Sequence, residues 1–250
     1  MIHRPACRRP AAAVGLILTL AAALVVAAPA HAWEIRQDAP AADFARFHDA
    51  FAPAAFPAPR HGAGPLGWIG FEIFAEASAI DGVGNEAFAD TTIRGSLPAD
   101  ALTIARVGAR KGLPGGFDIG ASYGEVVSAD FNLLSADVKW SILEGGPLKP
   151  ALALRVSGTR SSGSDVYDFQ QTAVDLSFSK GFANLTPYVG VGLLRSESRL
   201  DRIAGDPLKV DSTDQILFAG VTINLLVPRI TLAVEQGDQL QAAVRLSIGL

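Results

Sequence analysis

The chain has 250 residues, 49% of them hydrophobic and 18% charged, with 21 Lys and Arg against 25 Asp and Glu. The resulting net charge of −4 disfavours nucleic acid as a partner, because nucleic-acid-binding surfaces are basic. The single cysteine lies at position 7, so a small fold stapled by disulfides is excluded.

The first 32 residues have the pattern of a secretory signal peptide. Three arginines begin it (Arg4, Arg8 and Arg9), residues 11–28 form an apolar run, and positions 30–32 read Ala-His-Ala, a small-residue cleavage site. A membrane anchor helix is the alternative, but the run is rich in alanine and Pro29 closes it. We therefore predict cleavage after residue 32 and a mature chain that starts at Trp33. That chain keeps 18 basic and 25 acidic residues, a net charge of −7, and no cysteine.

Residues 33–66 form a segment rich in alanine and proline, distinct in composition from residues 67–250. Between Pro40 and Pro53, three phenylalanines (Phe44, Phe47 and Phe51) follow the spacing of one helix face. Proline suits the first turn of a helix and stops a helix at its end. We predict a short helix here, packed on the periplasmic end of a barrel or in its mouth. Docking of a partner is the alternative.

From residue 67 to residue 250 the chain alternates apolar with small or polar residues, the period of a strand with two different faces. This alternation gives ten candidate strands of roughly bilayer-crossing length: 67–79, 101–111, 116–125, 132–142, 150–159, 169–180, 187–198, 214–226, 229–236 and 239–250. The fold class predicted is therefore all-β: a transmembrane antiparallel β-barrel of about ten strands, preceded by a short helix or plug.

The connections between these strands support a membrane orientation. The second, fourth, sixth and eighth connections are short, whereas the first, fifth and seventh are longer and more polar. Outer-membrane barrels have short periplasmic turns, longer external loops and an even strand number. Ten strands with both termini of the chain in the periplasm fit this rule.

The two faces of the strands predict which side chains meet lipid and which line the lumen. One face carries apolar sets such as Val174, Leu176 and Phe178, which we assign to lipid. A charge facing lipid at mid-bilayer costs about 2–4 kcal/mol, so the charged residues of the strands must face inward. The lumen-facing candidates are Glu72, Glu76, Arg106, Arg110, Asp118, Asp137, Lys139, Arg155, Asp175, Glu235 and Arg245. Both signs occur, which favours a salt-bridged interior over a selectivity ring of one sign.

The sequence offers no convincing catalytic site. Barrel enzymes that use a histidine base need an imidazole on a strand or loop, but no histidine follows His61. His48, beside Asp49, reads as an exposed pair on the short helix. The seventh connection carries four acidic residues (Asp201, Asp206, Asp211 and Asp214) with no metal-loop spacing, so we interpret it as a solvated loop. We expect no catalytic residues, no cofactor and no metal.

Several segments together are similar to a known family. The stretches GFEIFAEAS, RVGARKGLPGGFDIGASYG, ADVKWSILEGG, PALALRVSGT and DLSFSKGFANLTPYVGVG resemble a family of uncharacterised bacterial outer-membrane β-barrel proteins. The resemblance spans most of residues 67–195 and implies a barrel in the outer membrane of a Gram-negative bacterium. It implies no substrate and no catalytic residues. Many such barrels end in an aromatic residue, whereas this chain ends Ile-Gly-Leu.

The leading hypothesis is an outer-membrane barrel without a catalytic site, in a structural, surface or narrow-pore role. Its expected partners are outer-membrane lipid and lipopolysaccharide, and the barrel assembly machinery through the last strand. The alternative is a transport barrel for a small solute, with the N-terminal segment as plug. A surface hydrolase that uses carboxylates alone, and a soluble periplasmic β-sandwich or lipocalin-like binder, are weaker alternatives.

Overall fold

The computed structural model describes residues 34–81, 91–93, 101–127, 129–146, 148–225 and 228–249. The predicted signal peptide, the mature start at Trp33, most of the first long connection and the last residue lie outside these ranges. Among the described helices, none combines the length and the apolar character needed to cross a membrane.

The predicted antiparallel barrel is confirmed: ten strands close into one sheet, each paired with its neighbours along the chain, and the last pairs with the first. The strands are β2 (Phe71–Asp81), β4 (Ala101–Leu113), β5 (Phe117–Val126), β6 (Asn132–Glu144), β7 (Ala151–Ser162), β8 (Tyr167–Ser179), β9 (Leu185–Leu200), β10 (Leu208–Asn224), β11 (Pro228–Gln236) and β12 (Leu240–Gly249). Closure leaves no unpaired strand edge, so the sheet cannot add a strand from another chain.

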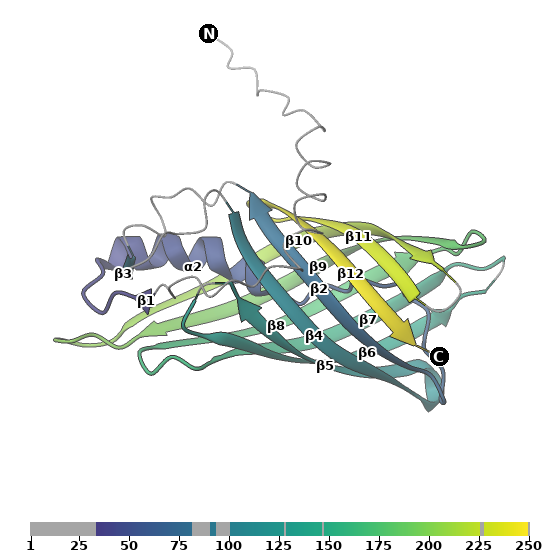
Figure 1. Ribbon diagram of the computed structural model, residues 1–250, viewed down its shortest axis with the longest axis horizontal. Coiled ribbons are helices and arrows are strands. Elements are labelled where there is room, and N and C mark those ends of the chain that lie inside the picture. Colours follow the sequence, from purple (N-terminus) through teal and green to yellow (C-terminus); the bar gives the residue numbers. More distant parts are fainter. Residues whose placement is uncertain are drawn as a thin grey trace, which may run out of the picture.

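Three further elements stand outside the barrel sheet. The helix α2 (Ala41–Ala55) precedes the barrel, the strand β1 (Glu34–Ile35) pairs with β3 (Thr92–Ile93), and a 3-10 turn (Pro114–Gly116) joins β4 to β5. In Figure 1, α2, β1 and β3 lie at the same end of the barrel, and the C-terminus lies at the other.

The two ends of the barrel differ. The connections β4–β5, β6–β7, β8–β9 and β10–β11 meet at one end, which we call the turn end. The other five connections meet at the opposite end, which we call the loop end. The β9–β10 hairpin projects furthest there (Figure 1).

The β9–β10 hairpin is longer than the sequence predicted. The expected seventh connection, 199–213, shrinks to 201–207, so Asp211 lies on β10 instead of in a loop, and Asp214 lies further along the same strand. The alternation continues through this extension with a changed outer face: Arg195, Glu197 and Arg199 point outward while the residues between them are buried. This pattern, with polar residues on the outer face and small or apolar residues on the inner face, is typical of a strand whose outer face is exposed to water.

The outer face carries a belt of exposed apolar side chains. Among its members are Ile73, Val107, Ile119, Leu134, Val138, Leu154, Val156, Val174, Leu176, Val189, Val191, Leu217, Leu246 and Ile248. The strand register joins them from strand to strand, as in the row from Ile119 through Val138 and Val156 to Val174. Exposed apolar surface on this scale marks contact with another apolar phase.

Glycines on the inner face make room for bulky neighbours. Phe218 lies directly opposite Gly190 and Tyr188 opposite Gly220, and a Cβ at either glycine would collide with the facing ring. In the same way Gly120 leaves space for Arg110 and Asp137. An aromatic ring that covers a glycine pins the strand register and restores packing that the missing side chain would lose. The inner glycines therefore serve packing, and they do not widen a pore.

Candidate functional site

The interior of the barrel is occupied by the chain's own N-terminal segment. Residues 56–66, which we call the plug segment, run from α2 at the loop end toward β2, whose first residue, Phe71, lies at the turn end. Successive wall side chains touch it along the way: Arg155 donates to Pro57 O (2.6 Å), Lys139 donates to Gly64 O (2.7 Å), and Leu66 N donates to Asp118 Oδ1 (3.0 Å). The predicted position of the helix at the periplasmic end or in the mouth resolves to the mouth at the loop end.

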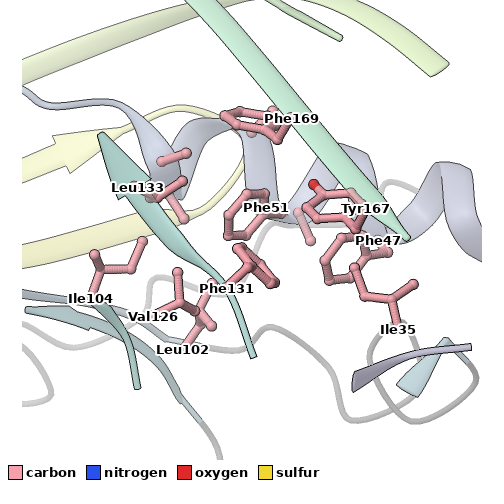
Figure 2. Close-up of a cluster of buried hydrophobic side chains, with 14 of the residues drawn as sticks. Ile35, Phe47, Phe51, Leu102, Ile104, Val126, Phe131, Leu133, Tyr167 and Phe169 are labelled. Atoms are coloured by element: carbon pink, nitrogen blue, oxygen red, sulfur yellow. The ribbon is translucent and has the colours of Figure 1, made fainter. Parts of the chain in front are cut away.

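The helix α2 seals that mouth with its apolar face. Phe44, Phe47 and Phe51, the three phenylalanines whose spacing predicted the helix, are all fully buried. Figure 2 shows Phe51 and Phe47 against Tyr167 of β8, with Phe131 beside both Phe51 and Tyr167. The Phe51 ring lies 5.1 Å from that of Phe169 and 5.5 Å from that of Phe131, both edge to face, the arrangement that aromatic pairs prefer.

The C-terminal end of α2 is capped by the barrel wall. The last carbonyls of a helix have no partner within the helix and carry partial negative charge. Here Gln171 Nε2 donates to Ala52 O (2.7 Å), and Arg106 Nη2 donates to Ala55 O (2.9 Å). Two inward-facing wall side chains thus complete the helix, which explains how α2 runs two residues past the stop expected at Pro53.

The structure brings the predicted lumen residues together in ion pairs. Of the eleven, ten are at most 5% exposed, and the side chain of Asp137 is 14% exposed. Lys139 Nζ lies 2.7 Å from Asp118 Oδ2, Arg155 Nη2 lies 2.7 Å from Asp175 Oδ2, and Arg110 pairs with Asp137. Burying an ion costs several kcal/mol unless a counter-ion and hydrogen bonds replace its water, and these pairs supply both.

One residue of the plug segment joins the largest of these groups. Arg60, 1% exposed, makes a two-pronged contact with Glu235 (Nε–Oε1 2.8 Å, Nη2–Oε2 3.1 Å) and lies 2.5 Å from Glu76 Oε1. Glu76 also faces Arg106 at 3.7 Å and Arg245 at 3.6 Å, and Arg245 lies 2.9 Å from Glu72. We call these six residues the central network.

Arg60 balances the charge of the central network. The wall contributes three carboxylates (Glu72, Glu76 and Glu235) and two arginines (Arg106 and Arg245) to it, while Arg229 reaches Glu72 only from the more exposed rim at 3.5 Å. Arg60 is the third cation of the network. Its forked guanidinium fits a carboxylate with two parallel hydrogen bonds, and Glu235 is the carboxylate it meets in this way.

Little space remains around the plug segment. A cavity of about 20 Å³ lies between Pro57, His61, Glu76 and Arg110, room for about one water molecule. A polar vestibule of about 370 Å³ lies next to His61 and is lined by Glu72, Lys139 and Arg229 among others. A larger furrow of about 1140 Å³ includes Ala109, Ala121, Ala136 and Gly158, neighbours in one row of the outer face. It belongs to the apolar belt.

His48 corrects the prediction of an exposed pair with Asp49. Its ring is fully buried between the extended strands, with Nδ1 2.7 Å from Ser198 Oγ on β9 and Nε2 3.1 Å from Ser212 Oγ on β10. Ser212 Oγ in turn donates to Asp214 Oδ2 at 2.7 Å. The prediction failed because local spacing cannot reveal the projecting hairpin that receives this helix face.

This serine–histidine–serine–aspartate chain has the residue types of a hydrolytic site. Ser198 and His48 are both 0% exposed, so a substrate cannot reach either in this conformation. In the arrangement present they bind α2 to the hairpin. Within the described residues, no group of three or more His, Cys, Asp and Glu side chains is placed to hold a metal ion.

Sequence reasoning missed Arg60, His61 and Gln171 as parts of the interior. Gln171 is inward-facing by the alternation of β8, so the strand pattern could have found it. Arg60 and His61 lie in a stretch without periodicity. His61 Nδ1 contacts Gly62 O at 2.8 Å, and its Nε2 faces the guanidinium of Arg110, contacts that only the path of the plug segment creates.

No protein-family model matches this chain, and no curated protein does. Among solved structures it is similar to the N-terminal β-barrel domain of Pseudomonas aeruginosa OprF, at 15% identity over 74% of this chain and 99% of that one, with a TM-score of 0.35. It is also similar to LpxR from Salmonella typhimurium (10%, 70% and 99%, TM-score 0.39) and to the Acinetobacter baumannii outer membrane protein Omp33 (6%, 75% and 99%, TM-score 0.31). Proteins of this group are bacterial outer-membrane barrels, and at these identities the likeness concerns the fold alone.

Removing Arg60 should destabilise the folded barrel strongly. Arg60→Ala leaves Glu235 and Glu76 buried with an uncompensated charge, which costs about 3–5 kcal/mol. The control Arg36→Ala removes an exposed pair with Asp38 and should cost at most about 1 kcal/mol. Guanidinium unfolding of the refolded protein in micelles measures both, and equal midpoints for the two variants would contradict the role of Arg60.

Docking of α2 should weaken in acid. Burial lowers the pKa of His48 below its usual 6.5, against the opposing effects of Asp49, Asp214 and Asp211. His48 therefore binds a proton less readily in the docked helix than in the undocked helix. The full free energy of docking is present above about pH 6.5, and docking weakens as the pH falls below that value. A fluorophore on Asp49→Cys should gain mobility between pH 7.5 and pH 5. His48→Gln, which cannot titrate, should abolish that pH dependence, and an unchanged profile in this variant would rule the mechanism out.

Proposed function

We propose that the protein is an outer-membrane β-barrel of a Gram-negative bacterium that serves a structural or surface role, without a catalytic site, and is closed by its own N-terminal segment. The observation that carries the proposal is the inverted distribution of side chains: a belt of apolar residues outside and paired ions inside. A soluble sandwich or lipocalin-like binder would hide its apolar face and wet its charged one.

The dimensions of the belt support the membrane environment. Most strands have ten to thirteen residues, close to the nine to eleven that cross a bilayer when tilted. Beyond the belt, the outer face of β9 turns to Arg195, Glu197 and Arg199, so each strand of the hairpin continues for about 20 Å of its own length past the apolar zone, at roughly 3.3 Å per residue. Long projections at the loop end fit the external side of an outer-membrane barrel.

Expected partners follow from these surfaces. The belt would contact the acyl chains of outer-membrane lipid. Arg195, Glu197 and Arg199 on the outer face of the β9–β10 hairpin, which we call the charged rim, would contact the headgroups of lipopolysaccharide. At the end of β12, Leu246 and Ile248 face outward and Ser247 faces inward. We expect the barrel assembly machinery to recognise this strand. The burial of Ser198 and His48 is the main argument against a catalytic site at these residues.

A second candidate function is transport of a small solute with the plug segment as a displaceable gate. The favouring observation is that each hydrogen bond found between residues 56–66 and the strands involves a wall side chain, as with Ser141 Oγ to Ala63 O. The strands pair fully with one another, so the plug segment could leave without breaking the ladder.

The closed barrel predicts no steady conductance from the intact mature chain in planar bilayers. A variant that lacks residues 34–62 should give defined steps, because it loses α2, Arg60 and most of the plug segment. Heat-modifiable gel migration checks that both proteins are folded. Steady conductance steps from the intact chain would overturn the closed state.

A disulfide can test the transport alternative without deleting anything. A Cβ built on Gly62 lies 3.8 Å from Ser179 Cβ, the mean separation in disulfides, so Gly62→Cys with Ser179→Cys should tie the plug segment to β8. Swelling of proteoliposomes in arabinose measures permeation. Transport through a displaced plug predicts that the oxidised variant is impermeable and that a reductant restores swelling, with each single cysteine variant as control. Identical rates in both redox states would remove the transport role.

A further inference from the structure

The N-terminal segment and the C-terminal strand lie at opposite ends of the barrel, although both the first and the last barrel strand have a terminus at the turn end. Phe71 pairs with Lys111 next to the β4–β5 turn, and Gly249 pairs with Glu72. Both the first and the last barrel strand therefore begin or end at the turn end. An N-terminal segment that simply preceded such a barrel would lie at the turn end too.

The chain instead turns back into the lumen. Gly67 has a positive φ of 80°, and the backbone of Gly112 lies so close to Gly67 that a Cβ there would overlap its carbonyl. A bond from Gly112 N to Gly70 O (3.0 Å) and bonds from Lys111 Nζ to the carbonyls of Trp68 and Gly70 hold this reversal. Glycine is the residue that such a turn and such a close approach require.

From the reversal, the contacts of the chain climb the wall in order. Leu66 meets Asp118 near the start of β5, Arg60 meets Glu76 in the middle of β2, and Ala52 meets Gln171 toward the loop end of β8. The eleven residues 56–66 could reach at most about 36–40 Å when extended, enough to pass a hydrocarbon layer of about 30 Å. Together, the plug segment and the last turn of α2 therefore span the barrel from the turn end to the loop end.

The chain before the crossing is anchored at the loop end. The helix α2 packs on Leu102, Val126 and Leu200, each at the end of its strand next to a loop-end connection. His48 ties it to the β9–β10 hairpin, and Gln37 Nε2 donates to Asp201 O in the connection of that hairpin (3.2 Å). β1 pairs with β3, inside the long connection that follows β2. The strand β1 thus lies at the end of the barrel opposite the C-terminus, as Figure 1 shows. The prediction that both ends of the chain lie on the same side of the membrane is therefore wrong for the described residues.

We propose that residues 34–55 are displayed on the outer surface of the cell: the chain threads its own lumen, so its N-terminal part faces outward while its C-terminal strand ends in the periplasm. This inference rests on the proposed outer-membrane orientation, with the loop end external. The displayed surface consists of the exposed residues Glu34, Asp38, Pro40, Ala41, Ala42, Arg46 and Asp49. Together with the charged rim of the β9–β10 hairpin, it forms the face that the cell presents.

Cysteine labelling in intact cells tests this placement, because the predicted mature chain has no cysteine of its own. In a Cys7→Ser background, three exposed positions each receive one cysteine: Asp49→Cys on α2, Asp206→Cys in the β9–β10 connection, and Leu148→Cys in the β6–β7 turn. A membrane-impermeant maleimide is applied before and after permeabilisation of the outer membrane. Heat-modifiable migration confirms that each variant is folded.

The display model predicts that Asp49→Cys and Asp206→Cys are labelled in intact cells and that Leu148→Cys is labelled only after permeabilisation. If Asp206→Cys is labelled but Asp49→Cys behaves like Leu148→Cys, the inference fails while the proposed function stands. If Asp206→Cys itself is protected in intact cells, the proposed orientation fails, and surface display fails with it. Ala63→Cys, fully buried in the plug segment, should stay unlabelled until the barrel is unfolded.

Discussion

The contact of Arg60 with Glu235 and Glu76 is the interaction on which the rest of the interior depends. A barrel of ten strands has too little interior for a wide channel, and its charged lumen residues must be neutralised where bulk water is scarce. To the central network the wall supplies three carboxylates and two arginines, and Arg60 supplies the third cation. Because Arg60 comes from the plug segment, the wall and the plug are each incomplete without the other, and the charge balance holds the segment at one height in the lumen.

That height in turn positions α2. Between Arg60 and the end of the helix there are only four residues, so fixing Arg60 at Glu76 brings the last turn of α2 to Arg106 and Gln171. Arg106 serves both parts: it faces Glu76 in the central network and donates to the carbonyl of Ala55. A cation that faces a carboxylate and a helix C-terminus at once is favoured by both. The phenylalanine face of the helix then lies against Tyr167 and Phe131, and the mouth closes with an apolar cluster.

Much of this architecture follows from alternation, and the remainder does not. In β7, one stretch of period two shows that Arg155 lies on the opposite face from Leu154 and Val156, and a charge on the apolar face is costly enough to decide the direction. Pairing of Arg155 with Asp175 needs the register between β7 and β8, which alternation leaves open. The proline-rich stretch has no period at all, so the position of Arg60 could not be predicted. His48 was misjudged because its partners Ser198 and Ser212 are 150 and 164 residues away.

The separation of backbone and side-chain roles explains how the plug segment seals the barrel without being part of its sheet. The strand ladder keeps every β-strand paired without the plug segment, so sealing adds nothing to the sheet and takes nothing from it. The burial of the central network holds the segment in place. Without water nearby, the loss of Arg60 leaves Glu235 without its cation, whereas in a hydrated lumen water and salt would take the place of Arg60. Opening, which the transport alternative requires, would therefore have to bring water to Glu235 and Glu76 as Arg60 leaves.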